Sequence, residues 1–139
     1  MKLDLSALKK ALIQLEKSLH YLGSDMAKKD EELRTQFRSA SIQAFEYTYE
    51  LCVKMIRRQL EQVVPNPSEV KGMSFMEMMR TAAEAGLMRD PSKFKTYREK
   101  RSITSHTYDQ EKAEKIAETL DGFLQEARFI LKELQRRNV

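Results

Sequence analysis

The chain has 139 residues, of which 41% are hydrophobic and 33% charged, as is typical of a soluble globular domain that buries its own core. Four glycines, three prolines and no tryptophan favour an all-helical fold over a β-sandwich, which needs frequent turn residues. The single cysteine excludes an intrachain disulfide and a cysteine-based metal site, and no apolar run approaches the ~18 residues that span a bilayer. Because the N-terminus lacks a signal-peptide pattern, we expect a cytoplasmic protein.

Leucine spacing predicts the first helix, over residues 4–22. Six leucines recur there at intervals of three and four residues, which makes one apolar stripe, and Gly23 ends the helix. Residues 28–62 contain neither glycine nor proline and continue a helical apolar period, so we expect a helix about 50 Å long. Residues 63–72 are predicted to form a loop, because two prolines there prevent a helix from continuing.

Cap residues delimit three more predicted helices. Ser74, Asp90 and Asp109 each stand where a side-chain oxygen can cap a helix N-terminus, and Gly86 marks a C-terminal stop. The three predicted helices cover residues 74–85, 90–101 and 109–137. We expect the methionines of the first to pack in the core, and the last to carry a long apolar inner face.

Together these elements predict an all-α protein. The expected architecture is an up-and-down bundle of four to five helices, three of them long, in a single domain over residues 1–139. The sequence shows no internal repeat and no low-complexity tract that would indicate a second unit.

The net charge of +4 is concentrated in one short segment, residues 89–101. It holds six basic side chains against Asp90 and Glu99, and this excess of four equals the charge of the whole chain. Positive potential of this kind would attract a phosphate backbone. The alternative is a solvated helix face without a partner.

The stretch REKRSITSHTYDQEK, residues 98–112, joins the last two predicted helices and holds Arg101 and His106. An Arg-x4-His pattern alone is a weak signal, because it often arises by chance. Here it follows the basic segment and lies at a helix junction among hydroxyl-bearing residues. We therefore expect His106 to be accessible to solvent and available for proton transfer.

An arginine and a histidine together suit phosphoryl transfer without a metal. The histidine could take the proton of a ribose 2′-hydroxyl or give one to a leaving 5′-oxygen. The arginine could hold the non-bridging oxygens and stabilise their developing charge. Cleavage needs both an acid and a base, and a symmetric dimer with two motifs across one cleft would supply them. We expect no metal and no other cofactor.

Two segments, QAFEYTYELCVKMIRRQLE (43–61) and YREKRSITSHTYD (97–109), together resemble the HEPN superfamily. More narrowly they resemble its small bacterial branch of nucleotidyltransferase substrate-binding proteins, as does the intervening TAAEAGLMRD (81–90). The resemblance covers essentially the whole chain. It departs from the pattern at Ser102, where active HEPN ribonucleases usually carry Asn, Asp or His, and at Val53, where this branch usually has tryptophan.

The resemblance implies a dimerising helical bundle that forms a complex with a minimal nucleotidyltransferase. It also implies the toxin of a toxin–antitoxin pair, a metal-independent RNA endonuclease in which Arg101 binds phosphate and His106 is general acid or base. Ser102 would orient one of these two side chains. The partner would neutralise the toxin by AMPylating Tyr108, because an AMP group adds negative charge and bulk where RNA phosphate would lie.

Lys95, Arg98 and Lys100 are predicted to bind the RNA backbone beside the motif. Two other interpretations remain open. The chain could be a non-catalytic subunit that presents a substrate to the nucleotidyltransferase, as an older view of the family holds. Alternatively, the motif's arginine, histidine and tyrosine could form a structural hydrogen-bond network, in which case removing the histidine would destabilise the fold by roughly 1–3 kcal/mol.

Overall fold

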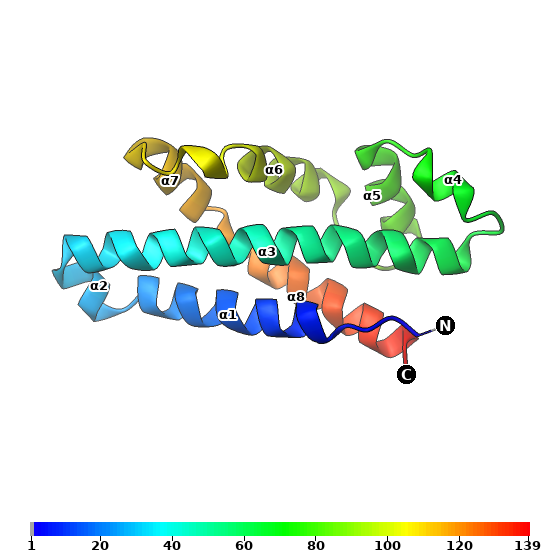
Figure 1. Ribbon diagram of the computed structural model, residues 1–139, viewed down its shortest axis with the longest axis horizontal. Coiled ribbons are helices and arrows are strands. Elements are labelled where there is room, and N and C mark those ends of the chain that lie inside the picture. Colours follow the sequence, from blue (N-terminus) through cyan, green and yellow to red (C-terminus); the bar gives the residue numbers. More distant parts are fainter. Residues whose placement is uncertain (1) are drawn as a thin grey trace.

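A computed structural model describes residues 2–139 and shows an elongated bundle of helices, with no strand in that range (Figure 1). The longest helix, α3 (Glu31–Val63), runs the length of the molecule, with α1 (Ser6–Leu22) along one side and α6 (Pro91–Ser102) along the other. Its 33 residues correspond to about 50 Å, as the sequence predicted.

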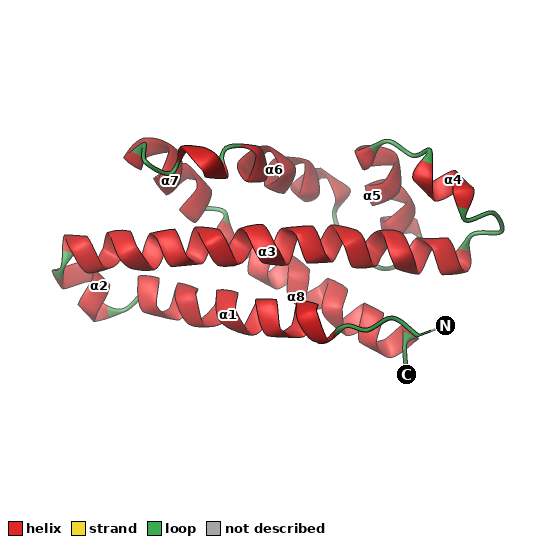
Figure 2. Ribbon diagram, in the orientation of Figure 1, coloured by secondary structure: helices red, strands yellow, loops and turns green. Residues whose placement is uncertain are grey.

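Among the other helical segments of the described residues, α8 is about as long as α1 and the rest are shorter than α1. Brief loops join them (Figure 2). They are α2 (Asp25–Lys29), α4 (Ser68–Lys71), α5 (Phe75–Glu84), the 3-10 helix η1 (Thr104–His106), α7 (Gln110–Ala117) and α8 (Leu120–Arg137). Successive long helices alternate in direction (Figure 1), and the Leu3 N–H donates to Asn138 Oδ1 at 3.0 Å, which ties the segment before α1 to the residue that follows α8. The predicted all-α, up-and-down bundle is confirmed.

Side-chain caps fix most helix starts. The side chains of Ser74, Asp90 and Asp109 each accept hydrogen bonds from backbone N–H groups of α5, α6 and α7, as predicted. Gly86 follows α5 with a φ of 78°, a conformation that a residue with a Cβ adopts only under strain. Local chemistry therefore sets the starts of these three helices and the end of α5.

Three sequence-based boundaries were wrong. The expected final helix is divided into α7 and α8 at Glu118 and Thr119, where the Thr119 hydroxyl donates to the Ile116 carbonyl at 2.7 Å. The long helix begins at Glu31 rather than residue 28, because Asp30 caps it and the preceding residues form α2. The predicted loop at 63–72 contains the single turn of α4.

Aromatic packing fixes α6 against α3 and α8. Phe45, Phe94 and Phe123 are fully buried, one from each of these helices. Phe123 meets Phe45 edge-on at a centroid distance of 4.9 Å and Tyr97 at 5.1 Å. Residues four apart share a helix face, so the buried Tyr97 directs Arg101 back toward α3. The core thus positions the first motif residue.

None of the helices in residues 2–139 combines the length and the apolar composition that crossing a bilayer requires.

Candidate active site

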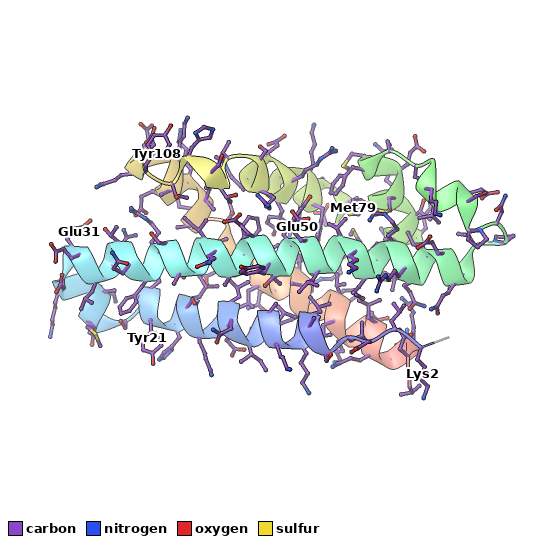
Figure 3. The ribbon with its side chains drawn as sticks, in the orientation of Figure 1. Lys2, Tyr21, Glu31, Glu50, Met79 and Tyr108 are labelled. Carbon is purple, nitrogen blue, oxygen red and sulfur yellow. The ribbon has the colours of Figure 1, made fainter. Side chains whose placement is uncertain are left out.

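The Arg101 guanidinium lies between α6 and α3, where two carboxylates of α3 hold it. Its Nε donates to Glu50 Oε1 at 3.0 Å, and its Nη1 lies 3.4 Å from Glu46 Oε2. Figure 3 places Glu50 near the middle of α3, on the side that faces α6. Glu46 and Glu50 are four residues apart, so that spacing could have indicated an acidic pair on one helix face. The sequence analysis did not identify them.

Thr104 is a second residue that the sequence analysis missed. Its hydroxyl accepts a hydrogen bond from Arg101 Nη1 at 2.9 Å and donates one to the Arg101 carbonyl at 2.9 Å. The side chain is buried in η1. Thr104 therefore links the orientation of the guanidinium to the backbone turn that follows α6.

These contacts leave one nitrogen of Arg101 available. Nε and Nη1 are engaged, whereas Nη2 donates no hydrogen bond within residues 2–139. The side chain as a whole is 34% exposed, so we expect a ligand from solvent to bind Arg101 through Nη2. Since both two-nitrogen edges of the guanidinium are partly occupied, a phosphate binds bidentately only after displacing a carboxylate or Thr104.

Ser102 does not orient either motif residue in this structure. Its hydroxyl donates to the Glu99 carbonyl at 2.6 Å, within α6, and it makes no hydrogen bond to Arg101 or His106. The expected orienting contact to the guanidinium comes instead from Thr104, two residues later. A serine at the end of a helix commonly bonds back to the preceding turn, which explains the difference.

His106 and Tyr108 form a separate pair at the outer end of the molecule. The imidazole Nδ1 and the Tyr108 hydroxyl lie 3.2 Å apart, and the rings meet edge-on at 5.9 Å. His106 is half-buried, whereas Tyr108 is 81% exposed and is drawn on the outer side of this end, away from α3 (Figure 3). No hydrogen bond in the described range joins this pair to Arg101.

The structure gives most of the basic segment other contacts. Arg89 and Lys93 approach the buried Glu126, at 2.7 and 3.7 Å. The Arg98 guanidinium lies over the Phe75 ring at 4.6 Å. Of the three cations expected to bind RNA, only Lys95 and Lys100 make neither an ion pair nor a cation–π contact within residues 2–139.

Glu114, in the middle of α7, joins that helix to α3. It accepts hydrogen bonds from Arg34, at 3.0 Å from Nη2, and from the buried Arg38, at 2.6 Å from Nη1. The Arg34 hydrogen bond is the main reason that the pKa of Glu114 falls to about 2, with Arg38 adding to it. This cluster holds α7, the helix that follows the motif, against α3.

Two shallow hollows lie along the exposed side of α3. The smaller, about 200 Å³, is lined by Gln43, Glu46, Tyr47, Glu50 and Arg101. The larger, about 530 Å³, is lined by Tyr47, Glu50, Leu51, Val53, Lys54 and Arg57. Tyr47 and Glu50 belong to both, so the hollows adjoin. Within residues 2–139 no three His, Cys, Asp or Glu side chains are grouped closely enough to hold a metal ion.

A family model and a curated relative both match nearly the whole length of this chain. A family model, nucleotidyltransferase substrate binding protein like, matches residues 3–136. A protein of Haemophilus influenzae named probable ribonuclease HepT is 39% identical over 141 residues, covering 99% of this chain and 95% of that protein.

Two solved structures share the fold. One, from Haemophilus influenzae, is described as revealing the fold of a substrate binding domain of a nucleotidyltransferase. It has a TM-score of 0.90 and 36% identity, and the match covers 95% of this chain and 99% of that one. The other, a protein of Thermus thermophilus, has a TM-score of 0.69 and 28% identity over 91% of this chain and 98% of that one.

Proposed function

Because the chain belongs to the nucleotidyltransferase substrate binding protein like family, we propose that it is a HEPN-type toxin that cleaves RNA without a metal. The observation that carries the proposal is the Arg101 side chain, which three side chains orient but which is still 34% exposed and donates from Nη2 to none of residues 2–139. The relative named probable ribonuclease HepT supports the same activity.

The proposed reaction is attack of a ribose 2′-oxygen on the adjacent phosphorus. The 2′-hydroxyl proton passes to a base, the bond from phosphorus to the 5′-oxygen breaks, and an acid protonates the leaving oxygen, which yields a 2′,3′-cyclic phosphate. Arg101 donates from Nη2 to the non-bridging oxygens, whose charge grows during the reaction. His106 is one of the two proton-transfer groups.

A second copy of the chain would supply the other histidine. Each chain holds one histidine in the motif, and Arg101 and His106 belong to separate sets of contacts. In a two-fold symmetric dimer each surface meets its own copy, so two motifs can face one cleft. Arg101 of one copy could then act beside His106 of the other.

Regulation by a nucleotidyltransferase is the second part of the proposal. Tyr108 exposes 81% of its surface, which leaves its hydroxyl accessible to another protein. In the proposed modification the phenol oxygen attacks the α-phosphate of ATP, the phenol loses its proton and pyrophosphate leaves. The resulting AMP group would place negative charge beside His106, which lies 3.2 Å from that hydroxyl.

The proposal is tested by RNA cleavage in EDTA, with wild type, His106→Ala and Tyr108→Phe compared as purified proteins. Wild type should release cyclic-phosphate ends, and His106→Ala should be at least about 100-fold slower, the usual contribution of a general acid or base. Tyr108→Phe should cleave like wild type. Mass spectrometry first establishes that Tyr108 is unmodified. Equal rates for wild type and His106→Ala would refute the catalytic role.

A substrate-presenting subunit is the competing function. It is favoured by the two carboxylates on Arg101, which reduce its attraction for phosphate, and by the description of the Haemophilus influenzae structure. This interpretation predicts no toxicity when the chain is expressed without its partner. Toxicity of the wild type that is lost in His106→Ala, with the variant folded, would exclude it.

A further inference from the structure

Arg101 by itself is a weak anchor for an RNA strand. Glu46 and Glu50 both lie within 3.4 Å of its guanidinium, so the three side chains together carry a charge of −1. The Arg98 guanidinium lies over the Phe75 ring and forms no ion pair with Glu46 or Glu50. Affinity for a polyanion must therefore come from other cations near the motif.

Lys54 and Arg57 are the cations next along α3. They line the hollow of about 530 Å³ that adjoins Arg101, and they are exposed. Neither forms an ion pair within residues 2–139, in contrast to Arg89 and Arg101. They stand three residues apart, so they project from one side of the helix on successive turns. The one carboxylate in this hollow, Glu50, is already paired with Arg101.

Tyr47 gives the same surface a flat aromatic face. It belongs to both hollows and is 62% exposed, although large aromatic side chains are usually buried. It makes no hydrogen bond and no aromatic contact in the described residues, unlike Tyr49 and Tyr97 of the core. No hydrogen bond or ring contact within residues 2–139 therefore accounts for an aromatic residue at position 47.

The spacing of these groups matches a single strand. From Tyr47 to Arg57 the helix advances about 15 Å, and positions 47, 50, 54 and 57 share one face. Proteins that bind single-stranded RNA combine a cationic groove for the backbone with aromatic rings that stack on bases. Half-buried Leu51 and Val53 give the hollow an apolar floor that suits unpaired bases.

We propose that this surface of α3 is a single-stranded RNA subsite, in which Lys54 and Arg57 bind backbone phosphates and Tyr47 stacks on a base. It would hold the nucleotides that extend from the phosphate at Arg101. The main track then runs along α3 rather than along the Lys95, Arg98 and Lys100 side of α6. The inference rests on the proposed ribonuclease function and names where its substrate binds.

The test measures affinity and its salt dependence with a fluorescein-labelled, 2′-O-methyl 12-mer RNA, which cannot be cleaved because the nucleophile is blocked. The double variant Lys54→Gln/Arg57→Gln should bind about tenfold more weakly at 0.1 M salt. Its plot of log K against log salt should lose a slope of about 1.4, since each contact to a single strand contributes about 0.7. The matched control Lys9→Gln/Lys10→Gln removes two exposed charges from α1, and should change neither quantity.

Tyr47 is tested in the same assay. Tyr47→Ala should weaken binding about tenfold, and Tyr47→Phe, which keeps the ring, should bind within about twofold of wild type. In cleavage of unmodified RNA, the KM of Tyr47→Ala should be higher than that of wild type, and the KM of Tyr47→Phe should be close to it. For Tyr47→Ala the kcat at saturating RNA should change little, because the ring is not placed at the reacting phosphate.

The outcomes separate this inference from the proposed function. If wild type cleaves RNA but the Lys54/Arg57 variant matches the Lys9/Lys10 control in affinity and slope, the subsite is refuted and the ribonuclease stands. If folded wild type neither binds nor cleaves RNA, both fail. If the variants change the sedimentation coefficient from that of wild type, the surface is an interface between copies of the chain, and the subsite is also refuted.

Discussion

Glu114 gives the sharpest stability prediction, because one carboxylate pairs with two arginines of α3. Replacing Glu114 by glutamine removes the charge partner of both Arg34 and Arg38. Arg38 is buried, and its Nη1 lies 2.6 Å from the carboxylate. Lowering the pKa of the carboxyl from 4.5 to about 2 corresponds to about 3 kcal/mol at full strength. The Glu114 side chain is 36% exposed, so solvent screening reduces this to about 1–2 kcal/mol.

The same pairing predicts a pH dependence. The folded-state pKa of Glu114 lies below the unfolded value, so its stabilisation is complete above about pH 5. It is lost as the pH falls, and is gone below about pH 2. Wild type and Glu114→Gln should therefore differ in free energy of unfolding by about 1–2 kcal/mol at pH 7. The difference should shrink steadily between pH 5 and pH 2.

Urea unfolding followed by circular dichroism at several pH values measures both effects. The matched control is Glu111→Gln, an exposed carboxylate in the first turn of the same helix that lies 3.6 Å from Lys115. It should cost less than about 0.5 kcal/mol at pH 7. A difference between wild type and Glu114→Gln that stays constant down to pH 2 would refute the role assigned to the charge. So would an equal loss in Glu111→Gln.

Three further predictions concern the core and the motif. Phe123→Ala should lower the free energy of unfolding by about 3–5 kcal/mol, because Phe45, Phe94 and Tyr97 would face a cavity, and a loss below about 1 kcal/mol in urea titration would contradict this packing. Thr104→Val keeps the shape of the side chain but removes the hydroxyl bound to Arg101. The free energy of unfolding should therefore fall by about 1 kcal/mol, and RNA cleavage should slow. Thr104→Ser, which keeps the hydroxyl, should have the stability and the cleavage rate of wild type. Burial raises the pKa of the Cys52 thiol to about 12, so a thiol reagent at pH 8 should react only after urea unfolding, and rapid reaction of native protein would show that the thiol is accessible.

Much of the fold could be predicted because its signals are local. Apolar residues at intervals of three and four define the inner faces of α1 and α3, and caps such as Ser74 and Asp109 satisfy N–H groups of the turn that follows them. The break between α7 and α8 carried no such signal. The apolar period continues from Ile116 to Leu120, both fully buried, with no glycine or proline between. The chain turns there because α7 packs against α3 and η1, whereas α8 packs against α3 and α1, and the apolar period does not encode these different partners.

The sequence by itself determined the helical class, most helix limits and the presence of an arginine and a histidine at one helix junction. Only the tertiary structure decided what surrounds them. Glu46 and Glu50 lie more than fifty residues before Arg101, and they meet it because the buried aromatic residues clamp α6 to α3. Residue spacing is informative along one helix, where geometry repeats. Contacts between helices depend on the packing of distant segments. The partners of Arg101, and the nitrogen that donates to none of residues 2–139, could therefore be identified only in three dimensions.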